Sequence, residues 1–439
     1  MKNNNFHIHR RRNKALGVPE LIAIALGGMV GGGIFTVLGI SVATIGAWTP
    51  VAIAVGGAIA ALAAYSYIKL GVYYRDEGAT YAFYKKTFPR TPFAASLIGW
   101  WVIFGYISTL ALYAYTFASY AIADFAFADV EWVRKLVAGG ILLAFTLVNL
   151  WSVKGMGRIE DLMVYTKLAI LVLISVVLVI NGRTSIPDLI ENDHQFSVLG
   201  ILMVASVTFV AYEGFQLVIN AVNEMETPER NIPRAIYAAI VLAVAIYVII
   251  ALGAILAIPF DDIVRDQEYA LAAGAQDVLG TWGSGLVIAG ALLATSSAIS
   301  GTIFGASRQM AVIAHDGYFP AILARRRARI PVHAIISMAL CAFALILVGS
   351  LRVILEFGSV TFLLVSLMMA WANFRIREKT RSSTFVTLLA ILGLLGGTVF
   401  IFYYEMSTQP EQLVFIGGLY VLLSVSAWLF ARYRKDHPL

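Results

Sequence analysis

Long apolar stretches separated by short polar connections follow one another along almost the entire chain. A helix needs about 20 apolar residues to cross the hydrocarbon core of a bilayer, and twelve stretches are long enough to do so. The pattern predicts an all-α polytopic membrane protein with twelve transmembrane helices. We place these helices near residues 18–44, 49–73, 93–123, 134–151, 161–181, 196–222, 234–258, 278–314, 332–349, 352–374, 384–404 and 411–432.

Two of the apolar stretches are interrupted near their middle. Residues 27–33 read GGMVGGG in the first stretch, and residues 211–215 read AYEGF in the sixth. Lipid offers no water to backbone N–H and C=O groups, so non-helical chain is tolerated at this depth only where protein or a wet cavity bonds to it. Paired interruptions of this kind are typical of transporter binding sites. We therefore expect the first and sixth helices to be discontinuous there.

The two interrupted helices divide the chain into halves. Each opens a run of five predicted helices, over residues 18–181 and 196–374, and residues 384–432 supply two more. Because five is odd, the second half must enter the membrane from the opposite side, which predicts an inverted repeat. No long polar insertion separates the segments, so we expect one transmembrane domain over residues 1–439.

Composition and charge agree with a membrane location. The chain is 60% hydrophobic and 13% charged, with a mean hydropathy of +0.81, far from the composition of a soluble domain. Of the 32 Lys and Arg residues, 26 fall in or beside the tail 1–17, the C-terminal tail and the loops on the same side. Cytoplasmic loops collect these residues, so we expect a multi-pass protein of the cell membrane with both termini cytoplasmic. The net charge of +6 is then a topology signal, and no nucleic-acid partner is expected.

Missing motifs exclude several other functions. Cys341 is the only cysteine, and all six histidines lie in tails, loops or helix ends, so neither a disulfide framework nor a mid-membrane metal site is expected. The chain has no P-loop and no G-x-S-x-G element. We therefore expect no enzyme activity and no cofactor. The basic triplets Arg10–Arg12 and Arg325–Arg327 are expected to be solvated, with contact to anionic membrane lipid as the alternative.

The glycines of the first interruption admit two interpretations. Without side chains, backbone N–H and C=O groups can meet a ligand directly, and helix ends carry partial charges that suit the charged groups of a zwitterion. Alternatively, pairs such as Gly27 with Gly31, or Gly28 with Gly32, allow two helices to pack closely. The glycines taken alone favour neither interpretation.

Three motifs resemble those of a known transporter superfamily. Residues 28–35 (GMVGGGIF) are similar to its first-helix motif G-x-x-x-G-x-G-I-F. Residues 210–215 and 224–236 resemble its sixth-helix motif and the loop after it, and residues 315–320 (HDGYFP) match its D-G-x-x-P. With these motifs in the right order over nearly the whole chain, the sequence resembles the amino acid, polyamine and organocation transporter superfamily. Within it, the sequence is similar to proton-coupled amino acid transporters of broad specificity. The resemblance does not specify a substrate.

The resemblance implies which residues bind an amino acid. In that superfamily the broken part of the first helix binds the substrate carboxylate, and the broken part of the sixth helix binds its amino group through carbonyl oxygens. Tyr212 stands where an aromatic side chain covers the substrate, with an ordinary packed tyrosine as the alternative. The matching positions here are Val30, Gly31, Gly32 and Gly33, followed by Thr208, Phe209, Ala211 and Tyr212.

Glu213 departs from the apolar residue that the superfamily usually has at this position. It lies nine residues before position 222, which is about 14 Å along a helix and too deep to reach water easily. A carboxylate at this depth is costly and is a functional hypothesis by default. It would attract a cationic substrate, carry a proton, or bond to backbone groups that the interruption frees.

Lys167 in the fifth helix has two interpretations. It lies about 9 Å of helical rise from Asp161, so its ammonium group can extend to the cytoplasm. Proton-coupled members of the superfamily carry a lysine here, where sodium-coupled relatives bind an ion, and the resemblance implies that Lys167 is the proton-coupling group. Small hydroxyl residues of the eighth helix line the same site in the superfamily. Ser296 and Ser297 are therefore the expected partners of Lys167.

Together these features predict a secondary active transporter that imports amino acids by proton symport with alternating access. A sodium-coupled carrier or an amino acid exchanger, in which Lys167 is structural, is the main alternative. An ion channel and a substrate-sensing receptor are further alternatives. The expected partners are an amino acid, a proton and membrane lipid.

Overall fold

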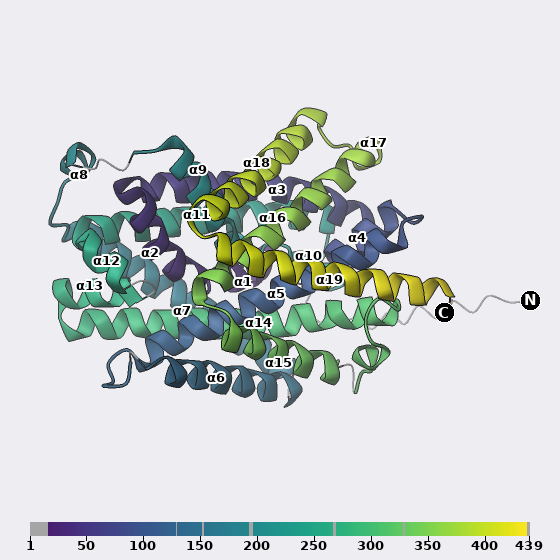
Figure 1. The fold of residues 1–439 in the computed structure, drawn as a ribbon, viewed down its shortest axis with the longest axis horizontal. Helices are drawn as coiled ribbons and strands as arrows, with labels where there is room; N and C mark the ends of the chain where they lie inside the picture. Colours follow the sequence, from purple (N-terminus) through teal and green to yellow (C-terminus); the bar gives the residue numbers. More distant parts are fainter. Residues whose placement is uncertain are drawn as a thin grey trace, which may run out of the picture.

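The computed structural model describes residues 16–128, 130–151, 153–192, 196–266, 269–327 and 330–436. Within these ranges the chain is almost entirely helical, and most of its long helices lie roughly along the long axis of the molecule (Figure 1). Arg10–Arg12, most of the predicted tail, and the histidines His7, His9, His194 and His437 lie outside the described residues.

Twelve helical units correspond one by one to the predicted membrane segments. In chain order they are α1 with α2 (Val18–Met29, Gly33–Ile45), α3 (Thr49–Tyr74), α5 (Pro92–Ile122), α6 (Glu131–Trp151), α7 (Val153–Ile180), α9 with α10 (Val198–Val207, Leu217–Asn220), α11 (Pro228–Ala257), α14 (Thr281–His315), α15 (Val332–Val348), α16 (Leu351–Arg375), α18 (Thr384–Thr408) and α19 (Pro410–Asp436).

Short helices and turns connect these units. The α-helical connections are α4 (Ala79–Thr87), α8 (Ile186–Asn192), α12 (Phe260–Asp266), α13 (Ala270–Leu279) and α17 (Arg377–Thr380). The 3₁₀ turns are η1 (Gly46–Trp48), η2 (Thr208–Tyr212), η3 (Val222–Glu224) and η5 (Ala321–Ala324).

The helices have the length and composition of membrane spans. Among the described residues, ten helical stretches are long and apolar enough to cross a membrane, and one of them, Gly33–Tyr74, contains both α2 and α3. α1 and α15 are shorter apolar helices. The predicted all-α polytopic fold is therefore confirmed. The boundaries differ most at α7 and α11, which begin at Val153 and Pro228, ahead of the apolar runs from which the spans were predicted.

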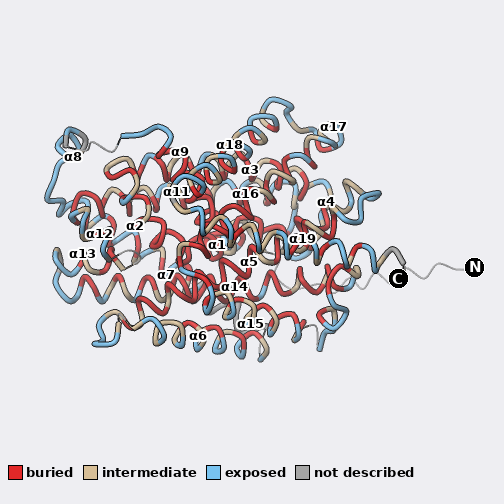
Figure 2. Tube along the Cα trace, viewed as in Figure 1, coloured by how far each residue is buried: buried red, intermediate tan, exposed pale blue. Residues whose placement is uncertain are grey.

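The core lies around α1, α5, α14 and α16, which are buried along most of their length (Figure 2). α6, α18 and α19 lie at the periphery and expose large apolar side chains, among them Leu143, Leu392 and Val414. An exposed apolar belt is the surface that lipid tails cover. The pattern of burial therefore places three helices between the core and the bilayer.

The connections divide between the two ends of the bundle. α4, α17 and the C-terminal end of α19 lie at one end, which we call the terminal end, and α8, α12 and α13 lie at the opposite end (Figure 1). The basic connections that the sequence assigns to the cytoplasm therefore gather at the terminal end. That this end faces the cytoplasm stays a prediction, as does the inverted repeat.

Both predicted helix breaks are present. α1 ends at Met29 and α2 begins at Gly33, with non-helical chain over residues 30–32. α9 ends at Val207 and gives way to the 3₁₀ turn η2, then to turns over residues 213–216 before α10. The expected discontinuity of the first and sixth helices is thus confirmed.

The two breaks lie in direct contact through glycines. Gly214 has a φ of 126°, which side chains disfavour, and a methyl group on it would lie 2.6 Å from the carbonyl carbon of Gly28 and from the nitrogen of Met29. A methyl group on Gly33 would lie 3.2 Å from Cα of Ala211. The backbones therefore approach as closely as they do because these positions lack side chains.

The start of α1 is also tied to the loop after α10. The backbone N–H of Leu16 donates to the carbonyl of Glu224 at 2.9 Å, and Leu16 and Met225 form an isolated parallel bridge. The first and sixth helices are thus joined both at their breaks and at the terminal end.

We expect Gly214→Ala to destabilise the protein by several kcal/mol. The strained φ costs about 1–3 kcal/mol, and overpacking against Gly28 and Met29 costs a similar amount. Thermal unfolding of the purified protein in detergent measures the change. Gly418→Ala is the matched control, because Gly418 lies in α19 with no atom within 4 Å of the added methyl group. Equal stability of the two variants would contradict the close approach of the breaks.

Candidate functional site

Side chains from α7, α5 and α11 bond to the carbonyl oxygens that the first break exposes, and those of α7 and α5 are described first. Lys167 of α7 donates from Nζ to the carbonyls of Gly27 at 3.1 Å and Val30 at 2.6 Å. Tyr113 of α5 donates to the carbonyl of Gly28 at 3.2 Å. Each of these carbonyls lies where a continuous helix would have supplied backbone N–H donors.

Lys167 is fully buried and joins the first break to α14. Its side chain has 0% relative exposure, and Nζ also donates to Oγ of Ser297 at 2.6 Å. An ammonium group carries three N–H donors, which match these three acceptors. The burial and these contacts contradict the interpretation in which Lys167 extends to water. Of the two expected serines, Ser297 is the one whose hydroxyl accepts from Lys167, and a role for Ser296 stays a prediction.

Tyr247 of α11 bridges the two breaks. Its hydroxyl oxygen lies 2.8 Å from the carbonyl oxygen of Met29 and 2.9 Å from that of Ala211, so its one proton is shared between the two acceptors, and its side chain is fully buried. Sequence reasoning identified neither Tyr247 nor Tyr113, because both lie inside ordinary apolar segments with no nearby motif. A tyrosine in such a segment needs a partner for its hydroxyl, and this was the available signal.

The Cα faces of the break glycines are filled by protein. A methyl group on Gly31 would lie 2.8 Å from Tyr113 and from Ala298, and one on Gly32 would lie 2.7 Å from Oγ1 of Thr116. The close-packing interpretation therefore holds for these faces. The N–H groups that begin α2 receive no side-chain cap, so the partial positive charge of this helix end remains available.

The second break is held by its own side chains and by α3. The hydroxyl of Tyr212 donates to the carbonyl of Ile53 at 2.8 Å, and its ring lies 5.3 Å from that of Tyr247. Thr208 donates from Oγ1 to the carbonyl of Ala205 at 2.8 Å, and Phe209 is fully buried. In this conformation Tyr212 is packed, and its role as a cover for substrate stays a prediction.

Glu213 is buried at the second break with one oxygen unpaired. Its exposure is 2%, Oε2 accepts from Nε2 of Gln216 at 2.5 Å, and Oε1 has no hydrogen-bond partner among the described residues. Gln216, not Glu213, accepts from the freed N–H of Gly214 at 3.1 Å and also donates to the hydroxyl of Tyr106. The recorded side-chain bond of Glu213 is to Gln216 and not to the backbone of the break, and its binding of a cationic substrate or of a proton stays a prediction.

The residues 315–320 fasten the terminal end of α14 to α4. Asp316 accepts from Lys85 at 2.5 Å and from the hydroxyl of Tyr81 at 2.8 Å. Burial and the neighbouring Asp316 carboxylate raise the pKa of the Tyr81 hydroxyl, so it remains a donor at neutral pH. This part of the motif has a structural role and contributes no group to the breaks.

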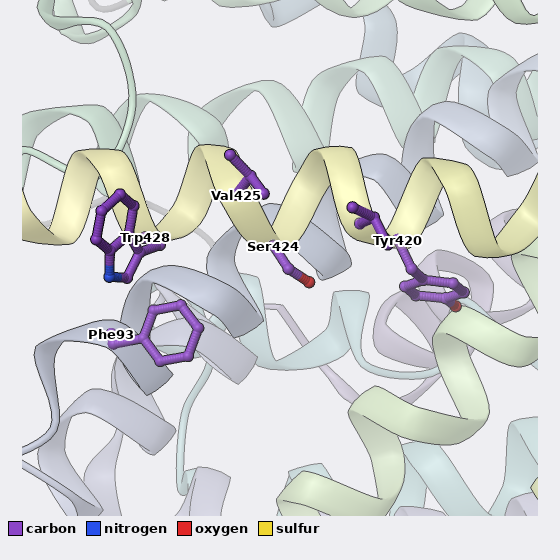
Figure 3. Close-up of a pocket in the computed structure, with 6 residues that line it drawn as sticks. Phe93, Tyr420, Ser424, Val425 and Trp428 are labelled. Carbon is purple, nitrogen blue, oxygen red and sulfur yellow. The ribbon is translucent and has the colours of Figure 1, made fainter.

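One hollow of about 370 Å³ lies on the outer surface, between α5 and α19. Its walls are almost entirely apolar, with Trp428 and Phe93 facing each other across it (Figure 3). It contains no residue of either break, so it is not the expected substrate site. The lining residues are Phe93, Tyr420, Val421, Ser424, Val425 and Trp428.

Comparison with known proteins gives the family. The profile of the amino acid permease family matches residues 16–427, which include both breaks and Lys167. The chain belongs to the amino acid permease family. This assignment confirms the resemblance to the amino acid, polyamine and organocation superfamily, and it identifies a membrane transporter and not an enzyme.

Similar proteins carry several transport names. The permease is 28% identical to an inner membrane transport protein of Escherichia coli, over 96% of this chain and 97% of that one. It is 25% identical to cationic amino acid transporter 7, chloroplastic, of Arabidopsis thaliana, over 80% and 63% of the two chains. It is 26% identical to the methylthioribose transporter of Bacillus subtilis, over 71% and 69%. These names agree on transport and differ in substrate.

We expect Tyr247→Phe to lower the free energy of unfolding of the permease by about 1–2 kcal/mol. The change removes the one proton that the carbonyls of Met29 and Ala211 share and leaves the carbonyl of Ala211 without that donor. A hydrogen bond between membrane helices is worth about 0.6 to 1.7 kcal/mol. Tyr212→Phe removes one bond to α3 and is the matched control, with a smaller expected loss. Unfolding in detergent measures both, and a Tyr247→Phe variant as stable as the parent would contradict the bridge.

Proposed function

We propose that this permease imports amino acids together with protons by alternating access. The observation that carries the proposal is the fully buried ammonium group of Lys167, bonded to the carbonyls of Gly27 and Val30 and to Ser297. Carbonyl and hydroxyl oxygens around a buried positive charge are the ligands that an alkali cation takes. Here the charge belongs to a group that can gain and lose a proton.

The contacts of Lys167 give proton release a mechanical consequence. A neutral amine has two N–H donors and a lone pair, so it cannot donate to three acceptors. Ser297 also donates to the carbonyl of Ala294 at 3.0 Å, and its hydroxyl is free to turn toward a neutral amine instead. Loss of the proton therefore weakens the hold of α7 on the break carbonyls. α1 would then move away from α7 and α14, which opens the terminal end.

The substrate is proposed to bind between the two breaks. Its carboxylate would bind at Val30, Gly31, Gly32 and Gly33, where the N–H groups that begin α2 favour an anion. In this conformation the N–H groups of Val30 and Gly31 donate to the carbonyls of Leu26 and Met29. Its amino group would meet carbonyls around Thr208, Phe209 and Ala211, with Tyr212 closing over the ligand. Because Gly33 and Ala211 are in close contact here, the breaks must separate to admit a substrate.

The orientation in the membrane is part of the proposal. The terminal end carries the basic connections, and cytoplasmic loops collect Lys and Arg. We place this end in the cytoplasm and the protein in the cell membrane. Opening of the Leu16 bridge to the loop after α10 would then release substrate inward.

We expect Lys167→Met to abolish accumulation driven by a pH gradient. Each pH unit is worth about 1.4 kcal/mol, so symport of one proton per substrate concentrates the amino acid about tenfold per unit. The variant should instead equilibrate substrate at equal concentrations, because it has no proton to carry. Uptake into proteoliposomes with an imposed pH gradient and no sodium measures the ratio. Lys69→Met is the matched control, since Lys69 is bonded to the carbonyl of Arg381, away from the breaks.

The outcomes separate the alternatives. A Lys167→Met variant that still concentrates the amino acid along a pH gradient would overturn the assignment of the coupling group. Accumulation that needs a sodium gradient indicates a sodium-coupled carrier, and uptake only against internal substrate indicates an exchanger. Conductance without saturable uptake indicates a channel, and binding without flux indicates a receptor.

We expect amino acids with both charged ends to stabilise the protein against heat. Ligand at about 100 times its Kd adds about 2.7 kcal/mol to the free energy of unfolding, whereas the amine without a carboxylate and the acid without an amino group should add far less. A thermal-shift panel of amino acids, these analogues and methylthioribose measures the difference. Stabilisation by methylthioribose and by none of the amino acids would overturn the substrate class.

The same panel assigns a role to Glu213. If Glu213 binds a cationic side chain, arginine or lysine stabilises the parent protein and loses this effect in Glu213→Gln, while neutral amino acids keep theirs. If Glu213 carries a proton, the variant binds all amino acids alike and changes the pH dependence of binding. The unpaired Oε1 oxygen agrees with both roles.

A further inference from the structure

Two buried glutamates lie together at the end of the bundle opposite the termini. Glu356 is in the second turn of α16 and Glu405 is in the last turn of α18, and each has an exposure of 1%. α17, at the terminal end, joins the C-terminal end of α16 to the start of α18. Both glutamates therefore lie toward the other membrane surface, away from Lys167 and its partners on α1, α7 and α14.

A single cation faces the two carboxyl groups. Arg352 donates from Nε to Oε1 of Glu356 at 2.7 Å and from Nη2 to the hydroxyl of Tyr404 at 2.7 Å. Among the described residues, Arg352 is the cation that forms an ion pair with Glu356, and its other partner, Tyr404, directly precedes Glu405 in α18. One positive charge is therefore available for two carboxyl groups.

Three of the four carboxyl oxygens are buried without a donor. They are Oε2 of Glu356 and both oxygens of Glu405, although the two side chains lie within hydrogen-bonding reach of each other. An ionised carboxylate only accepts, so two carboxylates cannot bond to each other, and an unpaired buried charge is costly. A proton on one carboxyl group supplies the missing donor, and the cluster with Arg352 then carries no net charge.

We propose that Glu356 and Glu405 form a proton-binding site that holds one shared proton, taken from the membrane surface opposite the termini. In the loaded state one carboxylic acid donates its O–H to the other carboxylate. On release the O–H electron pair stays with the carboxylate, the proton passes to water, and two negative charges face each other beside one arginine. The carboxylates then repel each other, and the contact between α16 and α18 weakens.

The site connects to the second break through α16. Ser359, one turn after Glu356, donates from Oγ to the carbonyl of Val207 at 2.8 Å, where α9 gives way to η2. A methyl group on Gly358 would lie 3.3 Å from Val210 of η2. A shift of α16 on proton release would therefore act directly on the break. This proton site is separate from the one proposed at Lys167, and the permease then responds to protons at two places.

Infrared difference spectroscopy tests for the shared proton without any need for transport. The difference between the parent protein and Glu405→Gln should show the carbonyl band of a protonated carboxylic acid, and this band should disappear as the pH is raised. Glu411→Gln, at an exposed glutamate in the first turn of α19, is the matched control and should show no such band. Absence of an acid band from both Glu405→Gln and Glu356→Gln difference spectra would overturn the proposal.

Thermal unfolding gives an independent readout. The stabilising contact exists while the proton is bound and is lost as the pH rises through its release, so the parent protein should lose stability with rising pH. Glu405→Gln keeps an amide donor toward Glu356 at every pH, and the corresponding part of this pH dependence should be lost. An unchanged pH profile would count against the site.

A third measurement needs no variant. A hydrophobic carbodiimide adds to protonated carboxyl groups in apolar surroundings, and mass spectrometry of the labelled parent protein should find the adduct on Glu356 or Glu405 at acid pH and lose it at alkaline pH. An adduct of equal yield at both pH values would overturn the proposal even if the variants fail to fold. None of the three measurements depends on which substrate the permease carries.

Discussion

Backbone carbonyl oxygens in the middle of a membrane must find donors, and this constraint organises the centre of the permease. Breaking α1 deprives the carbonyls of residues 27–30 of their α-helical donors at a point where the chain is buried inside the bundle. Lys167, Tyr113 and Tyr247 supply donors from α7, α5 and α11, and Lys167 adds a contact to α14. The helices that pack around the first break are therefore those that carry its missing hydrogen bonds.

The donor groups differ in whether they can lose the proton that they donate. A tyrosine hydroxyl keeps its proton across the physiological pH range, so the bonds from Tyr113 and Tyr247 are permanent features of this conformation. The ammonium group of Lys167 depends on these oxygens to compensate its charge, and in the proposed mechanism it releases a proton, which weakens its bonds to them. In that mechanism the tyrosine bonds hold the break in place, and the lysine bonds are switched.

Glycine packing makes the two breaks one mechanical unit. Gly214 and Gly33 allow the backbones of the first and sixth helices to touch, and Tyr247 bonds to carbonyls on both sides of this contact. A displacement of either half-helix is therefore transmitted to the other. α16 bonds to the same unit through Ser359, which donates to the carbonyl of Val207. The proposed proton release at Glu356 and Glu405 would therefore act on the second break through α16.

The sequence by itself determined the membrane spans and the two breaks, and it marked Lys167 as a charge within a span, while the coupling role of Lys167 came from the family resemblance and stays a proposal. These are local signals: hydropathy over about 20 residues, glycines within an apolar run, and a charge where charges are costly. The eleventh span is predicted to end at residue 404, whereas α18 continues to Thr408. Glu405 is the first residue beyond the predicted span, so its burial and its place beside Glu356 were not predicted.

Only the tertiary structure decided which side chains meet. It paired Lys167 with Ser297, 130 positions away in the chain, selected Gln216 over Glu213 to bond the freed backbone N–H, and placed Tyr247 across both breaks. Hydropathy shows that a residue is buried, but the partner of a buried polar group depends on the rotation and packing of helices that are distant in sequence. That choice belongs to the three-dimensional arrangement, because a hydrogen bond requires atoms about 3 Å apart and correctly oriented.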